Sequence, residues 1–366
     1  MVNVAMIGAG AISGIYMQNL VDVFEVVRLV GVCGRTREKV EAAQQKYGFS
    51  QIYNTVDDVL ADPAVDIVLN LTRPGDHYRI TRAALEAGKH VYTEKPLAAT
   101  LEEGRELAVL AEAKGLMLCG APDTFLGAGI QTCRKMVEDG WIGEPIGATA
   151  FMMSRGCEHR IPDPAFHFQH GDGPMMDMGP YYVTAMINLL GRVNGVMGVA
   201  KTTFPQRIIT SQPKRGTVIN VEVPTHVTGI LDFASGATGT LLTTVDVHYD
   251  TQARFEIYGT LGTLVVPDPN TFGGPIRLLR PEEGTWREMP LLFDYGENSR
   301  GLGIAEMAKA LETGRPARAG AQQLLHVLEI LTAFAKSSNE KQYISMETDF
   351  AQKPPMGHYA MHGVLD

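Results

Sequence analysis

The first third of the chain alternates runs of strand length with segments of helical periodicity. The strand-like runs, mostly apolar, are Val2–Ile7, Leu29–Cys33, Val65–Asn70, Lys89–Thr93 and Leu116–Cys119. The helical segments carry end signals, because Gly48 follows one as a C-terminal glycine and Thr100 with Glu103 forms a capping box before another. This alternation predicts a doubly wound parallel sheet of the α/β class.

After residue 122 the pattern changes to strand-like runs with few helices between them. The runs are Thr149–Met153, Val196–Thr203, Val223–Phe233, Thr238–Val247, Ala253–Tyr258 and Gly262–Val266. Helical periodicity recurs near 129–139, 181–190 and 321–336. We therefore expect two domains: residues 1–122 with the parallel sheet, and residues 123–366 as an α+β domain with a large, open, mainly antiparallel sheet.

Composition narrows the class of protein. Hydrophobic residues make up 45% and charged residues 20% of the chain, as in globular proteins. The net charge of -9 comes without a basic run, so we expect no nucleic-acid partner. No apolar run approaches the ~20 residues of a membrane span, and a strand beginning at Val2 leaves no room for a signal peptide. We expect a cytoplasmic protein without a membrane partner.

The strongest local motif is the glycine turn that follows the first strand. Gly8, Gly10, Ala11 and Ile12 lie between a strand and a helix, where bare backbone N–H groups and the helix N-terminus can bind a pyrophosphate. The third glycine of the usual fingerprint is Ser13 here. The alternative is a tight turn that binds nothing, but the strand–helix alternation around the motif favours a dinucleotide, NAD or NADP.

The end of the second strand bears on the choice between NAD and NADP. An NAD domain usually places Asp or Glu there to hold the ribose diol, whereas this chain has Gly34, Arg35, Thr36 and Arg37. A guanidinium and a hydroxyl suit a 2′-phosphate, which gives a slight lean toward NADP. The alternative is that Arg35 stacks on the adenine or lies in solvent.

Two further segments carry candidate chemistry. Glu94, Lys95 and Pro96 stand where a parallel strand leaves the sheet at its carboxyl edge, and a lysine there can stabilise an alkoxide as hydride leaves. Asp177 and Tyr181 are four residues apart and predict one helical face, on which a carboxylate and a phenol form a proton-transfer unit. The alternatives are a surface ion pair for the first segment, and a helix cap with a core tyrosine for the second.

The glycine turn, the Glu94–Pro96 segment and the Asp177/Tyr181 pair follow one another along the chain. Their sequence and spacing resemble those of the glucose–fructose oxidoreductase/inositol dehydrogenase/MocA family. The resemblance implies that Lys95 contacts the reacting hydroxyl, that Asp177 touches substrate, and that Tyr181 is the general acid/base where many members have histidine. It also implies that Glu94 and Lys95 flank the nicotinamide. Residues expected to line the cofactor groove are Thr72, Pro74 and His77. The substrate is then a small carbohydrate.

The resemblance also implies two candidate walls of the substrate site. One is the crossing segment 121–127 with Asp123, and the other is the loop 154–164. In the loop, Arg155, His159 and Arg160 would hold an anionic group on the sugar if they converge. The alternative is that they are solvated, or that they pair with Glu158 and Asp163.

The leading hypothesis is an NAD(P)-dependent sugar or polyol dehydrogenase. The first alternative is a glycosidase that oxidises a sugar carbon, eliminates the aglycone and returns the hydride, and for this NAD is expected. The second is a non-catalytic dinucleotide-binding sensor. His159, His167 and His170 form no ligand pair on a predicted helix, so no metal is expected. The resemblance also implies a homodimer or homotetramer that assembles through the C-terminal sheet.

Overall fold

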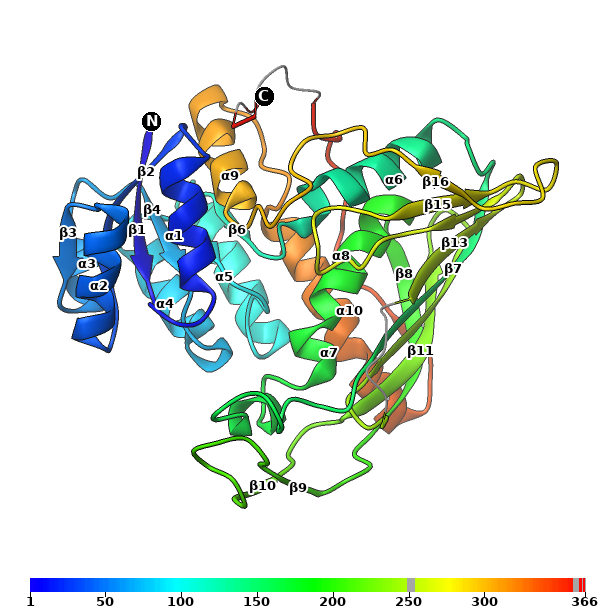
Figure 1. The fold of residues 1–366 in the computed structure, drawn as a ribbon, viewed down its shortest axis with the longest axis horizontal. Helices are drawn as coiled ribbons and strands as arrows, with labels where there is room; N and C mark the ends of the chain where they lie inside the picture. The colour runs from blue at the N-terminus through cyan, green and yellow to red at the C-terminus, as the bar shows by residue number, and fades with distance from the viewer. Residues whose placement is uncertain (249–253, 358–361, 364, 366) are drawn as a thin grey trace.

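The computed structural model describes residues 1–248, 254–357, 362, 363 and 365. Figure 1 shows a parallel sheet with its helices at one end of the molecule and a larger, strongly curved sheet at the other. Helices that follow the first domain along the chain lie between the two sheets. The site that the sequence predicts falls in this region between them.

The N-terminal sheet is six-stranded and parallel, with the order β3-β2-β1-β4-β5-β6. Its strands are β1 (Val2–Ile7), β2 (Val27–Cys33), β3 (Gln51–Tyr53), β4 (Ile67–Asn70), β5 (His90–Thr93) and β6 (Leu118–Gly120). Its helices are α1 (Ser13–Asp22), α2 (Arg37–Tyr47), α3 (Val56–Ala61), α4 (Pro74–Glu86) and α5 (Leu101–Ala113). This order is that of a doubly wound dinucleotide-binding fold, whose ligands bind at the carboxyl ends of the central strands.

The helix ends in this domain follow the sequence signals. Gly48 adopts the left-handed conformation with φ of 71° just after α2, a conformation that costs glycine no steric penalty. Thr100 accepts a hydrogen bond from the backbone N–H of Glu103, and the Glu103 carboxylate accepts one from the backbone of Thr100. Both predicted helix ends are confirmed.

The second sheet is nine-stranded, in the order β16-β15-β14-β13-β7-β12-β11-β8-β17. Its longer strands are β7 (Pro145–Met153), β8 (Val193–Lys201), β11 (His226–Phe233), β12 (Thr238–Thr244) and β13 (Arg254–Gly259). Its shorter strands are β14 (Thr263–Val265), β15 (Ile276–Leu279), β16 (Arg287–Met289) and β17 (Ile344–Ser345), and a separate hairpin pairs β9 (Gln206–Ile208) with β10 (Val218–Asn220). All neighbours pair antiparallel except β7 and β12, which are parallel. Ala253, where we expected β13 to begin, lies outside the described residues.

Among the described residues, five α-helices follow the first domain, and the last two of them pack on it. They are α6 (Ala128–Glu138), α7 (Pro174–Asp177), α8 (Gly179–Leu190), α9 (Leu302–Thr313) and α10 (Ala321–Glu340). α10 packs against β8 on one side and α5 on the other, so it ties the two sheets together. None of the helices in the described part of the chain has the length and apolar character needed to cross a bilayer.

The single helix expected to carry both Asp177 and Tyr181 is two helices. Met178 separates α7 from α8, and Pro180 follows at the second position of α8. Proline lacks the N–H that would continue the hydrogen bonding of α7. Asp177 therefore ends one helix and Tyr181 lies in the first turn of the next.

A buried histidine joins α10 to the segment after β17. The His326 Nε2 atom accepts a hydrogen bond from the Val193 N–H at 3.2 Å, its Nδ1 atom lies 2.7 Å from the Thr348 hydroxyl, and that hydroxyl donates to Glu329. Because the Thr348 hydroxyl donates to Glu329, Nδ1 must donate to that hydroxyl, while Nε2 accepts from Val193. An imidazole with one donor and one acceptor nitrogen is neutral. Burial accordingly lowers the pKa of His326 from 6.5 to about 4.

We expect His326 to contribute to acid sensitivity. Its pKa is lower in the folded chain than in the unfolded one, so its stabilising contribution is lost as pH falls from 6.5 towards about 4. The variant His326→Gln keeps an acceptor and a donor but does not titrate. Between pH 6.5 and about 4, the free energy of unfolding of the wild type should therefore fall by about 1–3 kcal/mol more than that of the variant. Urea unfolding at several pH values measures this. Parallel pH profiles for the two proteins would contradict the assignment.

Candidate active site

The glycine turn between β1 and α1 leaves its backbone open. Gly8 has φ of 111°, and a side chain there would meet the Leu71 carbonyl oxygen at 2.5 Å, so only glycine fits. Gly10 and Ala11 are exposed, and a Cβ on Gly10 would meet no atom within 4 Å. Ser13, in place of the third glycine, is buried and donates its hydroxyl to the Gly10 carbonyl at 2.7 Å. The residues of this turn fit the pyrophosphate of a dinucleotide.

The end of β2 presents cationic and hydroxyl groups. Arg35 and Thr36 are exposed, whereas Arg37 is occupied by hydrogen bonds to Glu41 and Asn54, both at 2.8 Å. Residues 34–37 include no carboxylate. The adenosine end of the groove therefore presents the exposed Arg35 guanidinium, and residues 34–37 offer no acidic acceptor for a ribose diol.

The residues after β4 form a layer beneath the predicted groove. The Thr72 N–H and hydroxyl both donate to the Asn70 side-chain oxygen, and Pro74 begins α4. His77 is 1% exposed, with Nδ1 2.7 Å from the Pro96 carbonyl and Nε2 3.1 Å from the Thr72 carbonyl. Burial lowers the pKa of His77. This histidine thus lies behind the groove and connects it to the segment that carries Lys95.

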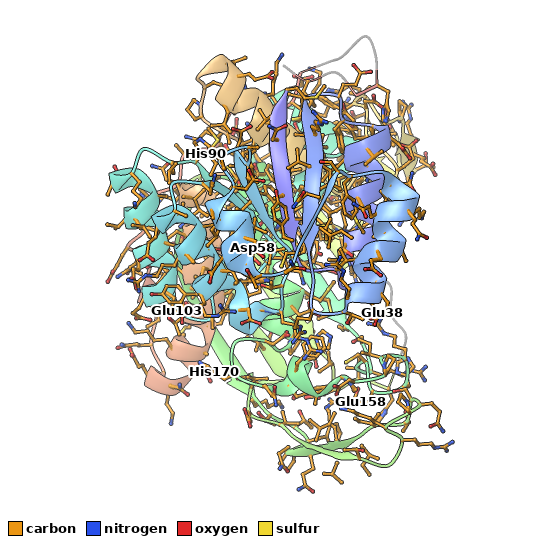
Figure 2. The ribbon with its side chains drawn as sticks, turned by 90° about the vertical axis from the view of Figure 1, so that its left-hand side faces the viewer. Glu38, Asp58, His90, Glu103, Glu158 and His170 are labelled. Carbon is orange, nitrogen blue, oxygen red and sulfur yellow. The ribbon has the colours of Figure 1, made fainter. Side chains whose placement is uncertain are left out.

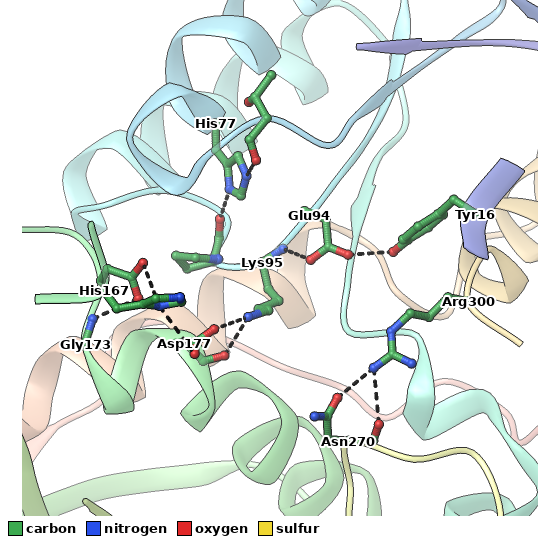
Figure 3. A network of polar contacts seen from close by, with 12 residues as sticks. Tyr16, His77, Glu94, Lys95, His167, Gly173, Asp177, Asn270 and Arg300 are labelled. Carbon is green, nitrogen blue, oxygen red and sulfur yellow. Dashed lines mark hydrogen bonds and ion pairs between the residues drawn. The ribbon is translucent and has the colours of Figure 1, made fainter. Parts of the chain in front are cut away.

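Glu94 is held by the helix that follows the glycine turn. Its carboxylate accepts a hydrogen bond from the Tyr16 hydroxyl at 2.8 Å and one from the Lys95 backbone N–H at 3.1 Å (Figure 3). Tyr16 is in α1 and fully buried. Burial next to Glu94 raises the pKa of the Tyr16 phenol, which stays a donor. α1 therefore fixes the end of β5 as well as the turn before it.

Lys95 and Asp177 form an ion pair between the two domains. The Lys95 Nζ atom lies 2.6 Å from Asp177 Oδ1 and 2.7 Å from the Asp177 carbonyl oxygen (Figure 3). It also lies 5.3 Å from the centre of the Tyr181 ring. Burial alone would lower the pKa of Lys95, but the Asp177 carboxylate outweighs it and raises that pKa. In the same way, Lys95 lowers the pKa of Asp177 against the effect of burial.

The Tyr181 hydroxyl has a partner that the sequence did not indicate. The Arg300 guanidinium is near enough to help lower the pKa of Tyr181, and it binds the Asn270 side-chain oxygen at 2.7 Å. Burial raises the pKa of Tyr181, while Lys95 and Arg300 oppose that rise. Arg300 stands in a loop without regular periodicity, so only the tertiary structure brings it here.

Asp123 lies elsewhere than the substrate wall expected for it. Its side chain is 2% exposed, and its carboxylate accepts from the backbone N–H groups of Gly301 and Gly303 at 2.8 and 3.1 Å. Burial raises its pKa to about 6. Asp123 therefore caps the start of α9 and supports the loop of Arg300, and we do not keep it among the groups proposed to touch substrate.

The basic residues of the 154–164 loop are exposed. Arg155, His159 and Arg160 all lie at the surface. The carboxylates considered as their partners are taken by other cations, because Glu158 binds Arg207 at 2.5 Å and Asp163 binds Lys214 at 2.9 Å. Arg160 is near enough to Asp177 to help lower its pKa. Figure 2 shows Glu158 in the loops below the parallel sheet.

His167, Asp172 and Asp177 form the one three-residue group of the described chain with the spacing of metal ligands. One atom from each lies within 4.8 Å of the others. The Asp177 carboxylate already carries the Lys95 ammonium at 2.6 Å, and a divalent cation here would lie close to that positive charge. The absence of a metal stays a prediction.

The site thus combines four elements of chemistry. A glycine turn suits a pyrophosphate, a buried ammonium can donate to a developing alkoxide, a phenol between two cations can exchange a proton, and carboxylates fix the cations. All lie at the carboxyl edge of the parallel sheet, where such folds bind nucleotides. This arrangement can transfer hydride from an alcohol carbon to a nicotinamide.

Comparisons with known proteins agree with this chemistry. The family model "Oxidoreductase family, NAD-binding Rossmann fold" matches residues 2–120, and the model "GFO/IDH/MocA C-terminal domain" matches residues 130–265. The boundary that we expect at 122/123 falls between these regions and stays a prediction. The D-xylose dehydrogenase of Paenarthrobacter nicotinovorans is 22% identical, with 86% of this chain and 85% of that protein aligned.

Two further relatives align over almost the whole chain. The scyllo-inositol 2-dehydrogenase (NADP(+)) of Bacillus subtilis is 22% identical over 94% of this chain and 96% of its own. A structure of levoglucosan dehydrogenase in complex with NADH and L-sorbose superposes with a TM-score of 0.83 at 21% identity, covering 95% of this chain and 99% of the other. The chain belongs to the Gfo/Idh/MocA family of NAD(P)-dependent sugar and polyol oxidoreductases.

Proposed function

We propose that this protein transfers hydride reversibly between C4 of the nicotinamide and a secondary hydroxyl of a cyclic sugar or polyol. The observation that carries the proposal is the Lys95 ammonium, paired with Asp177 and placed over the Tyr181 ring at the carboxyl edge of the parallel sheet. A buried cation of this kind stabilises an alkoxide far better than water does. The family relationship supports the same reaction class.

Each of the three residues has a proposed role. Lys95 donates a hydrogen bond to the reacting oxygen, and Asp177 keeps Lys95 charged and in place. Tyr181 takes the hydroxyl proton as the carbon loses its hydride, helped by Lys95 and Arg300, which both favour the phenolate. The bound nicotinamide supplies the hydride acceptor. The residues proposed to form the groove for the whole dinucleotide are Gly8, Gly10, Ala11, Ile12, Arg35, Thr36, Thr72, Pro74 and Glu94, with the buried His77 supporting it from behind.

We also propose a preference for NADP over NAD. Arg35 and Thr36 are exposed at the end of β2, and no carboxylate stands among residues 34–37 to bind a ribose diol. A 2′-phosphate gains a charge-assisted hydrogen bond from a guanidinium. The name of the Bacillus subtilis relative, which includes NADP(+), is in line with this preference.

The substrate and the assembly are proposed from the second domain. Arg155, His159 and Arg160 are exposed basic residues of one loop, and such a surface suits an anionic group on the sugar. On the sheet, Met197, Val199 and Ile230 are 46%, 57% and 50% exposed on neighbouring strands. Apolar side chains exposed together on a strand surface mark an interaction site. We propose that this face forms the interface of a homodimer or homotetramer.

Loss of Lys95 or Tyr181 should abolish turnover while leaving the fold intact. We expect kcat of Lys95→Met and Tyr181→Phe to fall by about 10²–10⁴-fold, because each removes a group that acts on the reacting hydroxyl. The measurement is NAD(P)H formation with D-xylose, levoglucosan, scyllo-inositol and acidic sugars. The matched control is Tyr182→Phe, since Tyr182 is the next residue and lies in the core at 1% exposure.

The same assay separates this function from its alternatives. Net reduction of added cofactor by a free sugar supports the dehydrogenase. Release of an aglycone from glycosides without net reduction would assign the cofactor-recycling glycosidase instead. Wild-type turnover in both Lys95→Met and Tyr181→Phe would refute the roles given to these residues.

The NADP preference depends on Arg35. We expect Arg35→Ala to raise KM for NADP by about 10-fold, because the variant loses one charge-assisted contact to the 2′-phosphate. KM for NAD should change by less than about 2-fold. Arg37→Ala is the matched control, because Arg37 is two residues away but is bound to Glu41 and Asn54. Equal effects on both cofactors would show that Arg35 stacks on the adenine rather than reads the phosphate.

A charge on the exposed sheet face should disrupt assembly. We expect Ile230→Glu to shift the protein to monomers in analytical ultracentrifugation, because the carboxylate would be buried unpaired in the interface. Val109→Glu, on the exposed surface of α5 at 65% exposure, is the control that should leave assembly unchanged. If Ile230→Glu sediments as the wild type does, the interface lies elsewhere.

A further inference from the structure

A small unit of the second domain has an apolar core of its own. It consists of residues 154–172, which include the loop 154–164, and residues 204–223, which carry the β9–β10 hairpin (Figure 1). The backbone N–H groups of Thr210 and Ser211 in the hairpin both donate to the Glu158 carbonyl at 3.0 Å. The buried members of its core, which is separate from the two larger cores of the molecule, are Cys157, Phe168, Ile209 and Ile219. We call these two segments the wall unit.

The wall unit contacts the first domain at the predicted cofactor groove. The ring centre of Phe166 lies 5.1 Å from the guanidinium carbon of Arg73, the residue just before α4. Further along, a Cβ built on Gly171 would lie 2.9 Å from the Cβ of Ala99, so the two chains pass closely there. The direction in which the wall unit points therefore determines which surface it presents to the groove.

Arg207 is buried inside the wall unit and joins it to the rest of the second domain. Its side chain is 8% exposed, and Nη1 binds Glu158 of the loop at 2.5 Å. Nη2 binds the Asp246 carboxylate and donates to the Val245 carbonyl at 2.9 Å, just after β12 of the large sheet. The guanidinium carbon also lies 5.0 Å from the ring centre of Phe168. One side chain thus connects the hairpin, the loop and the end of a sheet strand.

This cluster fixes a direction more than it adds stability. Removing one guanidinium and two carboxylates from water costs about as much free energy as their attraction returns. Oε2 of Glu158 and Nε of Arg207 are also buried without a hydrogen-bond partner among the described residues. A planar guanidinium, however, holds each of its partners at a set angle, which an apolar residue of the same size does not do.

We propose that Arg207 is a positioning residue, which orients the wall unit so that residues 154–172 form a binding surface for the sugar beside Lys95 and Asp177. His167 of this segment already lies with Nδ1 3.8 Å from Oδ2 of Asp177 (Figure 3). Arg207 and Glu158 act from within the wall unit and touch neither sugar nor cofactor. The place of the sugar rests on the proposed function, whereas the orientation of the wall unit by Arg207 does not.

The first test is kinetic and uses Glu158→Gln and Arg207→Lys. The first variant leaves Arg207 paired with Asp246, so the buried charges balance and the chain should fold. The second keeps the positive charge but replaces the fork that reaches two carboxylates with a single ammonium. In both we expect KM for the sugar to rise by about 10-fold, while kcat and KM for NADP change by less than about 2-fold, because the reacting groups stay in place. The sugar is whichever of D-xylose, levoglucosan and scyllo-inositol the wild type oxidises fastest.

Lys214→Ala is the matched control. Lys214 of the hairpin pairs with Asp163 of the loop at 2.9 Å, so this pair joins the same two segments. Both side chains are about half exposed, at 49% and 44%. Exposed ion pairs contribute little, so every kinetic constant of this variant should stay within about 2-fold of the wild type.

Hydrogen exchange measures the orientation of the wall unit without any turnover. We expect the amide hydrogens of residues 154–172 to exchange about 10-fold faster in Glu158→Gln and Arg207→Lys, because the loop is then held only by its backbone contacts. Exchange in β1 and β4 of the first domain should stay as in the wild type. Lys214→Ala should match the wild type throughout.

The two measurements separate this inference from the proposed function. Equal exchange of residues 154–172 in the wild type and both variants refutes the positioning role, whatever the reaction is. Faster exchange with an unchanged KM refutes the binding of sugar at this surface. A fall in kcat together with faster exchange in β1 and β4 would assign Arg207 to general stability instead. If the wild type oxidises none of the sugars, the proposed function fails, and exchange alone decides whether Arg207 orients the wall unit.

Discussion

The ion pair of Lys95 and Asp177 is the interaction on which the site depends. Lys95 follows the last residues of β5 in the first domain, and Asp177 ends α7 in the second. Burial by itself would lower the pKa of the Lys95 ammonium, and the Asp177 carboxylate reverses this effect. The contact that keeps the lysine charged is therefore also a contact that joins the two domains. The ion pair of Lys95 and Asp177 thus serves both the proposed chemistry and the relative position of the two domains.

The surroundings of this pair hold it rigidly from both sides. On the cofactor side, Tyr16 binds Glu94, and the Pro96 carbonyl lies against His77. On the other side, Asp123 caps α9 and so fixes the loop that brings Arg300 to Tyr181. These supports are buried side chains with satisfied hydrogen bonds, which is how a site is held to the precision that hydride transfer needs. A substitution of Asp123 would therefore change the position of Arg300 beside Tyr181, although Asp123 is not among the residues proposed to bind substrate or cofactor.

Local sequence signals predicted the fold well, because strands, caps and turns depend on neighbouring residues. Gly48 and the Thr100 capping box lie where expected, and the expected strand runs overlap observed strands. The short strands β3, β15, β16 and β17 and the helix α9 were not predicted. Contacts between segments that are far apart in the sequence could not be predicted from local patterns. Arg300 has no pattern around it, and Asp123 looked like a cleft residue until its carboxylate was seen on the α9 backbone. The resemblance pointed to Lys95 and Asp177 together, and the structure supplies their distance.

Charge alternates along the line of groups that crosses the site. Glu94, Lys95 and Asp177 carry negative, positive and negative charge in turn, and the His167 ring then stands between Asp177 and the carboxylate of Asp172. Lys95 and Asp177 stabilise each other's charges, since each shifts the pKa of the other toward the ionised form. At the end of this line the compensation is incomplete, since the His167 contacts are longer than hydrogen bonds.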